Sequence, residues 1–272
     1  MIRILDKATI CRLILPHLST AKRGFVCRTH LAHVVNAILY KFKTGVQWKF
    51  LPVAALIPGA KIKYGAVFHH FRKWAKDGSW AAVRRAVGTE LKGLLDLSLA
   101  FFDGTHTPAA RGGKGVGYQR RKRRKTTNTL WLCDRNGLIV SYLPPTSGNH
   151  NDLYDIERAI RYLIDDLRRM HIPSDGLFIN ADAGFDASAL RHLLERFGIH
   201  LNAPVNPRRG RSEEEWYFDE MMYEERYKIE RTNAWMDANR TFATRYDTTL
   251  TSWIAWHDIQ CIKSWCRAAS KV

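Results

Sequence analysis

Residues 99–106 read Leu-Ala-Phe-Phe-Asp-Gly-Thr-His, and this stretch decides the fold that we expect. The apolar residues 99–102 predict a short buried strand that ends at Asp103. An aspartate in that position most often forms a turn or caps a helix, but it also suits a metal ligand. The same pattern recurs at residues 177–180, which lead to Asp182. Strands of this kind deliver their carboxylates to one edge of a sheet.

From residue 97 onward, the sequence alternates between predicted strands and helices. The dipeptide Asn136-Gly137 separates the strand patterns 129–132 and 138–143, which is a strong signal for a hairpin. The elements that follow are a helix, a strand, a helix, a strand and a helix, at residues 153–169, 177–180, 187–197, 199–205 and from about 213 through 230. This order predicts an α/β fold, a ribonuclease H-like mixed sheet flanked by helices.

The first 92 residues predict helices joined by short turns that contain glycine. One helix carries Phe68, Phe71 and Trp74 on one side and basic residues on the other. We expect these aromatic side chains, with Trp48, to lie in the core. The pattern fits an all-α, helix-turn-helix-like DNA-binding domain, but a helical bundle with solvated charges explains it equally well. We therefore expect a helical DNA-binding domain at 1–92 and a catalytic domain at 93–272.

The composition indicates a nucleic-acid partner. There are 43 Lys and Arg against 26 Asp and Glu, the formal net charge is +17 and the sequence pI is about 9.9. Ribosomal proteins and membrane-surface binders share such a charge. No apolar run approaches the roughly 18 residues of a membrane helix, and the N-terminus lacks the apolar core of a signal peptide, so we expect a cytoplasmic protein. Five scattered cysteines without a Cys-x-x-Cys pair favour reduced core thiols over a zinc site.

A third acid, Glu230, lies in the last helix of this predicted series. Three acids that meet in a basic protein need a cation, and carboxylates bind hard divalent ions. The basic run Arg120–Lys125 is more readily explained by contact with a DNA backbone than by solvation alone.

Several motifs along the chain belong together. They are Asp-Gly-Thr-His at 103–106, Tyr-Gln-x-Arg-Lys at 118–122, Lys-Thr-Thr-Asn at 125–128, Ser-Gly-Asn-His-Asn-Asp at 147–152, Asn-Ala-Asp-Ala-Gly-Phe-Asp at 180–186 and Tyr-x-Ile-Glu-Arg-Thr-Asn-Ala-Trp at 227–235. In this order they resemble the DDE transposases of the IS5 and IS4 type. The segment Thr44-Gly-Val-Gln-Trp48, with the aromatic helix after it, resembles the helical N-terminal domain of that family.

The resemblance implies a transposase that binds the terminal inverted repeats of an insertion sequence and then cleaves and joins DNA. It assigns Asp103, Asp182 and Glu230 as ligands of two Mg²⁺ or Mn²⁺ ions. The family pattern of Tyr, two residues, Arg, three residues and Glu matches Tyr223, Arg226 and Glu230, so the resemblance adds Tyr223 and Arg226 as catalytic residues. On one continuous helix these three residues would share a face, where the arginine can hold a phosphate through two hydrogen bonds and the tyrosine can hydrogen-bond or stack beside it. The implied partners are double-stranded DNA, both transposon ends and target, and a second copy in a homodimer, in the cytoplasm of a bacterium and on its nucleoid. The side chains expected to contact DNA are Arg72, Lys73, Lys76, Arg120, Arg121, Lys122, Arg123, Arg124, Lys125 and Arg231.

The chain departs from the family pattern at Asp237, where the family places a lysine seven positions after its glutamate; Arg240 is one candidate substitute. Two other functions stay open. A metal-dependent nuclease would cut DNA without joining it, and a non-catalytic protein derived from a transposase would only bind it. We expect Asp186 to be the N-cap of the helix that starts at 187. His106 and His150 are more often loop residues with hydrogen bonds than catalytic groups.

Overall fold

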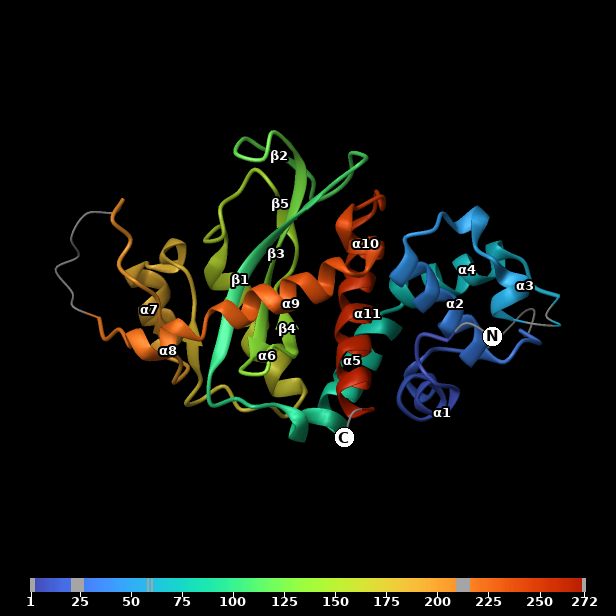
Figure 1. The fold of residues 1–272 in the computed structure, drawn as a ribbon, viewed down its shortest axis with the longest axis horizontal. Helices are drawn as coiled ribbons and strands as arrows, with labels where there is room; N and C mark the ends of the chain where they lie inside the picture. The colour runs from blue at the N-terminus through green and yellow to red at the C-terminus, as the bar shows by residue number, and fades with distance from the viewer. Residues whose placement is uncertain (1–2, 21–26, 58, 60, 209–215, 271–272) are drawn as a thin grey trace.

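The computed structural model describes residues 3–20, 27–57, 59, 61–208 and 216–270. It has a central mixed β-sheet with helices against it and an N-terminal group of helices at one side (Figure 1). The strands are β1 Ala100–Pro108, β2 Gly117–Gln119, β3 Arg124–Asp134, β4 Ile139–Tyr142, β5 Thr146–Ser147, β6 Phe178–Asn180 and β7 His200–Asn202.

The sheet has the ribonuclease H-like arrangement that the sequence predicts. Its strand order is β2-β3-β1-β6-β7, and β4 and β5 also pair with β3. β1 and β3 run antiparallel, whereas β1 pairs with β6, and β6 with β7, in parallel. The expected hairpin forms between β3 and β4, where Gly137 has φ +80°. Glycine reaches that backbone conformation without steric cost.

The first strand is longer than expected, because it does not stop at Asp103. β1 continues to Pro108, and each of its residues faces a partner on β3, from Ala100 opposite Asp134 to Pro108 opposite Thr126. The second half of β1 has no apolar run, so its strand conformation depends on the tertiary pairing. Asp103 consequently lies inside a paired strand and not in a loop after it.

The helices of the N-terminal part are α1 Lys7–Thr9, η1 Ile10–Ile14, η2 Leu15–His17, α2 Leu31–Thr44, η3 Trp48–Phe50, α3 Val53–Leu56, α4 Tyr64–Lys76, α5 Ser79–Leu91 and η4 Lys92–Leu94. The later helices are α6 Ile156–Arg169, η5 Ala183–Phe185, α7 Ser188–Glu195, α8 Glu220–Glu224, α9 Tyr227–Asp237, α10 Arg240–Ala243 and α11 Leu250–Ala269. The single helix expected from about 213 through 230 is wrong. It is divided between α8 and α9, and residues 209–215 lie outside the described part of the chain.

Aromatic side chains join the N-terminal helices to α11, the last helix. The ring of Phe71 on α4 stacks on Trp256 of α11 with centroids 4.1 Å apart, and Trp48 lies 5.3 Å from Phe71. Phe71 and Trp74 are fully buried, while Trp48 and Phe68 are half-buried against the core. The prediction that these aromatic residues belong to the core is confirmed. All five cysteines are free thiols; Cys133, Cys261 and Cys266 are buried as expected, whereas Cys11 and Cys27 are only half-buried.

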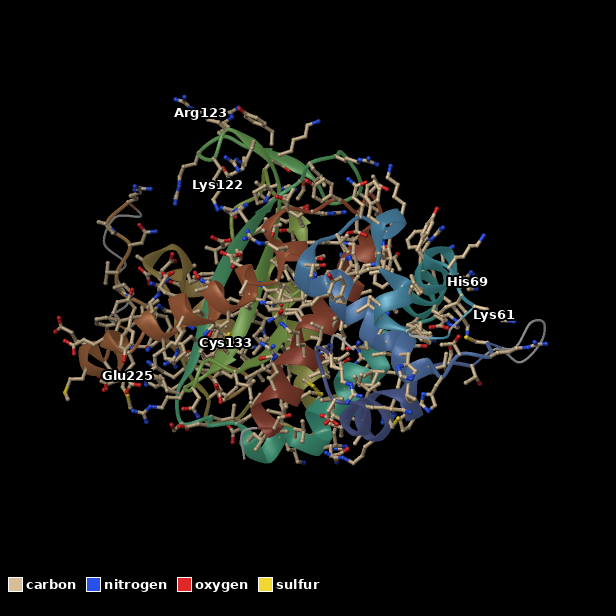
Figure 2. All side chains as sticks on the ribbon, turned by 45° about the vertical axis from the view of Figure 1, so that its right-hand side comes forward. Lys61, His69, Lys122, Arg123, Cys133 and Glu225 are labelled. Atoms are coloured by element: carbon tan, nitrogen blue, oxygen red, sulfur yellow. The ribbon has the colours of Figure 1, made fainter. Side chains whose placement is uncertain are left out.

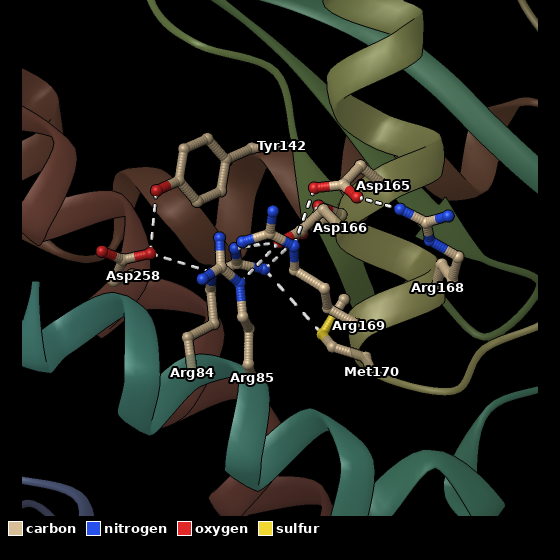
Figure 3. A network of polar contacts seen from close by, with 10 residues as sticks. Arg84, Arg85, Tyr142, Asp165, Asp166, Arg168, Arg169, Met170 and Asp258 are labelled. Carbon is tan, nitrogen blue, oxygen red and sulfur yellow. Dashed lines mark hydrogen bonds and ion pairs between the residues drawn. The ribbon is translucent and has the colours of Figure 1, made fainter.

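A buried network of charges connects α5 to the sheet and to α11 (Figure 3). Arg84 of α5 donates two hydrogen bonds to Asp166 of α6, at 2.6 and 2.7 Å, and one to Asp258 of α11 at 2.9 Å. Ser141 and Tyr142 of β4 donate to the same two carboxylates. Buried charges are tolerated only when they are paired and hydrogen-bonded in this way. Helix α5 ends at Leu91, just before the predicted domain boundary at residue 92. Through Arg84 this helix binds α6 and α11, which belong to the second predicted domain.

Candidate active site

Asp103 lies on β1 at the place where α9 crosses the sheet (Figure 1). Its Oδ2 accepts a hydrogen bond from Asn233 Nδ2 of α9 at 3.0 Å, and its Oδ1 is 3.5 Å from the guanidinium of Arg226. Burial raises the pKa of Asp103, and the charge of Asp182 acts in the same direction. The Asn233 hydrogen bond and the Arg226 charge oppose this shift. The site thus holds a carboxylate whose pKa is raised by burial, against the opposing effects of Asn233 and Arg226.

Asp182 reaches the same end of the sheet through the register of the parallel strands. Phe101 of β1 pairs with Asn180 of β6, so Asp103 and Asp182 each stand two residues beyond this pair. The Asp182 side chain accepts a hydrogen bond from the backbone N–H of Gly184 at 2.7 Å and so caps η5. The negative charge of Asp182 contributes to raising the pKa of Asp103. The structure brings these two predicted ligands together.

Glu230 is exposed on α9 and is not brought into a ligand group with the two aspartates. Within the described ranges, no set of three or more His, Cys, Asp or Glu side chains is arranged to hold a metal ion. Asn233, which touches Asp103, follows Glu230 by three positions and shares its side of the helix. Glu230 is therefore about one helical turn away from the contact with Asp103. Its role as the third ligand stays a prediction.

Tyr223 and Arg226 do not lie on one helix with Glu230, because the chain breaks between α8 and α9. Tyr223 belongs to α8 and packs on Phe218 with ring centroids 5.2 Å apart, whereas Arg226 is the N-cap of α9. Arg226 nevertheless points to Asp103, and its Nε is buried without a hydrogen-bond partner among the described residues. A buried donor without a partner suggests that a further acceptor is missing from this site.

Glu225, at the break between these helices, has a structural role. Its carboxylate forms ion pairs with Arg135 and Lys228, and their hydrogen bonds lower the pKa of Glu225 to about 2. A carboxylate already held by two cations is a poor candidate for a metal ligand. This environment distinguishes it from Glu230, which has no such partner in the described part of the chain.

The basic side chains expected to contact DNA fall into three places. Arg120–Lys125 form the exposed tip of the β2–β3 hairpin, from which Lys122 and Arg123 point outward (Figure 2). On α4, Arg72 and Lys76 are exposed, whereas Lys73 is half-buried and donates to the Ser19 carbonyl at 2.9 Å. Lys73 is therefore partly used to connect parts of the N-terminal region. The guanidinium of Arg231 donates to the Asn136 carbonyl at 3.1 Å and lies over the Trp235 ring.

Two smaller expectations have different outcomes. Asp186 is not the N-cap of the next helix; α7 starts at Ser188 after Ala187, and Asp186 binds Arg191 at 2.9 Å instead. Arg191 is buried, so it takes the carboxylate that would otherwise cap the helix.

His106 faces Thr126 and Gln119, and burial lowers its pKa. His150 stacks on Tyr154.

Sequence reasoning missed two residues next to Asp103. Asn233 is the amide that holds the carboxylate; it belongs to the motif at 227–235, but the motif gave it no role of its own. Asp152, in the turn after β5, lies against Gly104, the residue after Asp103 on β1; a Cβ added to Gly104 would come within 2.5 Å of Asp152 Oδ1. Asp152 in turn accepts a hydrogen bond from Asn128 of β3 at 2.6 Å. The turn at 147–152 therefore packs against the segment of β1 that carries Asp103.

No helix in the part of the chain that the structure describes is both long and apolar enough to cross a bilayer.

Comparison with family models gives two matches. Residues 9–84 match a model described as "Putative transposase of IS4/5 family", and residues 95–259 match the model "Transposase DDE domain". No curated protein matches the chain.

Solved structures also resemble the chain. One is the cryo-EM structure of a piggyBac transposase synaptic complex with hairpin DNA, which is 11% identical with a TM-score of 0.52, over 99% of this chain and 72% of that one. Another is a Mos1 transposase paired-end complex with the left transposon end, which is 14% identical with a TM-score of 0.30, over 93% of this chain and 82% of that one. At 11% identity, the similarity to the piggyBac transposase concerns the fold alone. The TM-score of 0.30 for the Mos1 complex is too low to support a conclusion about this chain.

Proposed function

The chain belongs to the family of transposases with a DDE domain, and on this premise we propose that it binds the terminal inverted repeats of an insertion sequence and catalyses DNA cleavage and strand transfer. The match covers the sheet, α9 and the first half of α11, and so includes β1, which carries Asp103, and α9, which contacts it through Asn233. The observation that supports the proposal is the register of β1 and β6, in which Asp103 and Asp182 each follow the Phe101–Asn180 pair by two residues.

The two aspartates suit a divalent metal ion. Each is a hard oxygen ligand, and the burial of Asp103 beside a second carboxylate leaves negative charge that a cation would neutralise. We assign Asp103 and Asp182 as ligands of Mg²⁺ or Mn²⁺, and Glu230 as a third ligand that joins when α9 adjusts on DNA. Two such ions, when bound, would activate the attacking group and stabilise the oxygens of the phosphodiester.

Arg226 and Tyr223 would act on the DNA. Arg226 already borders Asp103 and retains a buried N–H without a partner, so it can donate to a phosphate oxygen at the reacting position. Asn233 would keep the Asp103 carboxylate in orientation through its hydrogen bond. The basic hairpin Arg120–Lys125 would bind the backbone of the duplex beside the acids. Because two ends have to be joined, we expect a homodimer on the DNA.

The test compares Asp182→Asn with the wild-type protein. The substrate is a plasmid that carries the DNA flanking the coding sequence in its source, and cleavage and joined products are separated on gels with Mg²⁺, Mn²⁺ or EDTA. We expect Asp182→Asn to lose cleavage by at least about a hundredfold and to weaken Mn²⁺ binding measured by calorimetry, since it removes an anionic ligand.

Glu157→Gln is the matched control, because Glu157 is an exposed acid paired with Arg161 on α6. It should leave cleavage and metal binding unchanged. Cleavage without joined products would indicate a nuclease instead of a transposase. DNA binding without any metal-dependent cleavage in the wild-type protein would support the non-catalytic alternative.

A further inference from the structure

A cavity of about 530 Å³ opens next to the acids. It lies between the second half of β1, the tip of the β2–β3 hairpin and the segment from the end of α9 to α10. Thr105 and Thr107 line it from β1, Lys122 and Arg124 from the hairpin, and Arg240 from the first residue of α10. Its volume is in the range of pockets that hold a small-molecule ligand or a nucleotide.

The charged side chains around this cavity have no partners. The described residues offer neither an ion pair nor a side-chain hydrogen bond to Lys122, Arg124 or Arg240, and the one acid in the lining, Asp237, is also unpaired. With His106 neutral because burial lowers its pKa, the lining carries a net charge of +2. Other arginines of the molecule, such as Arg84 and Arg191, are held by carboxylates. Unpaired cations around a hollow attract an anionic ligand.

The cavity is connected to Asp103 by one side chain. Asn233 donates to Asp103 through Nδ2, and its Oδ1 accepts a hydrogen bond from Thr105 Oγ1 at 3.4 Å. Asp103 and Thr105 are two positions apart on β1, so their side chains point to the same face of the sheet. A DNA strand with its reacting phosphate at Asp103 could therefore extend directly into the cavity.

We propose that this cavity binds one nucleotide of the DNA strand, next to the phosphodiester that reacts at Asp103. Arg240, Lys122 and Arg124 bind its phosphate, and the two threonine hydroxyls bind phosphate or sugar oxygens. Asp237 repels the same phosphate and keeps the affinity low enough for the product to leave. Such contacts set the register of the strand without reading its sequence. The proposal rests on the proposed function, because it adds a subsite to the same active site.

The experiment measures DNA affinity in EDTA, so that metal binding and cleavage do not contribute. A fluorescent duplex of arbitrary sequence serves as the probe, since phosphate contacts do not depend on sequence, and its Kd is measured over a series of salt concentrations. We expect Arg240→Ala to weaken binding about threefold to tenfold and to reduce the slope of log K against log salt by about one. We expect Asp237→Asn to tighten binding by about twofold to tenfold.

Arg168→Ala is the matched control. Arg168 is an exposed arginine on α6 that pairs with Asp165 and does not line the cavity, so its removal changes the net charge equally. The proposal is overturned if Arg240→Ala resembles Arg168→Ala or if Asp237→Asn fails to tighten binding. Because a misfolded variant does not bind more tightly, the Asp237→Asn result is independent of folding defects. Failure of the wild-type protein to bind any duplex would instead contradict the proposed function itself.

Discussion

At the scale of single residues, the position of Asp103 depends on what packs behind it. Its own side chain faces Asn233 and Arg226, while the next residue, Gly104, faces the other side of the sheet and receives Asp152. Asp152 cannot easily move away, because Asn128 holds its carboxylate at 2.6 Å. A residue without a Cβ is thus required next to the acid, for reasons of space and not of backbone conformation.

Gly104→Ala should disturb both stability and activity. The new Cβ would lie 2.5 Å from Asp152 Oδ1 and 3.0 Å from Leu130 Cδ2, so the turn or β1 has to shift. We expect a loss of about 1–3 kcal/mol in the free energy of unfolding, measured in urea, and a matching loss of cleavage. Gly93→Ala is the control, because nothing lies within 4 Å of a Cβ added there. Equal stability of the two variants would show that Asp152 does not press on the strand.

Part of the candidate site could be predicted from the residue types along the sequence. Asp103 and Asp182 could be predicted because each follows an apolar strand pattern, and the parallel register then fixes their proximity. Asn233 could not be predicted as a partner of Asp103, since a neutral amide on a helix gives no signal of its own. Glu230 lies on a helix whose rotation about its axis is set by tertiary packing, and no periodicity in the sequence determines that rotation.

At the scale of elements, the helices and strands that have strong local signals could be predicted from the sequence. The β3–β4 hairpin follows from Asn136-Gly137, and α6 follows from its regular apolar spacing. The second half of β1 and the break between α8 and α9 were not predicted. The first is polar and exists through its pairing with β3, and the second occurs where Glu225 binds Arg135 and Lys228. Both depend on contacts between distant segments, which local propensity does not contain.

α11 contains a buried lysine that makes stability depend on pH. Lys263 is 4% exposed, beside Asn239 and the ring of Phe42, and burial lowers its pKa to about 7. Between this value and the ordinary value of 10.5, the folded protein binds fewer protons than the unfolded chain. The free energy of unfolding should therefore rise with pH across this window, by at most about 1.4 kcal/mol per pH unit from this group.

Lys263→Met removes the titrating group and tests this expectation. Urea unfolding at pH 7 and pH 9 should show that the wild-type protein gains about 2 kcal/mol more than the variant does over the interval. Other titrating groups are common to both proteins and cancel in the comparison. Parallel changes in the two proteins would mean that Lys263 has an ordinary pKa in the folded state.

At the scale of the whole molecule, the N-terminal helices and the sheet share one core. Arg84 links α5 to α6 and α11, and Phe71 of α4 stacks on Trp256 of α11. The sequence predicted two domains, because composition and periodicity change near residue 97. Side chains that cross between the parts have no signature along the chain, so the extent of this packing could not be foreseen.

Arg84→Met should destabilise the whole molecule. It leaves Asp258 buried without its cation and Asp166 with Arg85 alone, which costs about 3–5 kcal/mol. Chemical denaturation followed by both far-UV circular dichroism and tryptophan fluorescence should still show one transition, at a lower midpoint. Arg168→Ala breaks only an exposed pair and should cost less than about 1 kcal/mol. Two separate transitions in the wild-type protein would contradict a shared core.

The position of α11 has a consequence for synthesis on the ribosome. Helices α4 and α5 emerge long before residues 250–269, yet Phe71 stacks on Trp256 and Arg84 binds Asp258 of that later helix. Segments made early usually fold first, but here the early segment lacks the surface that completes it. A nascent chain would hold its N-terminal helices without these contacts until α11 has emerged, and a message cut short before codon 250 would yield a product that lacks them.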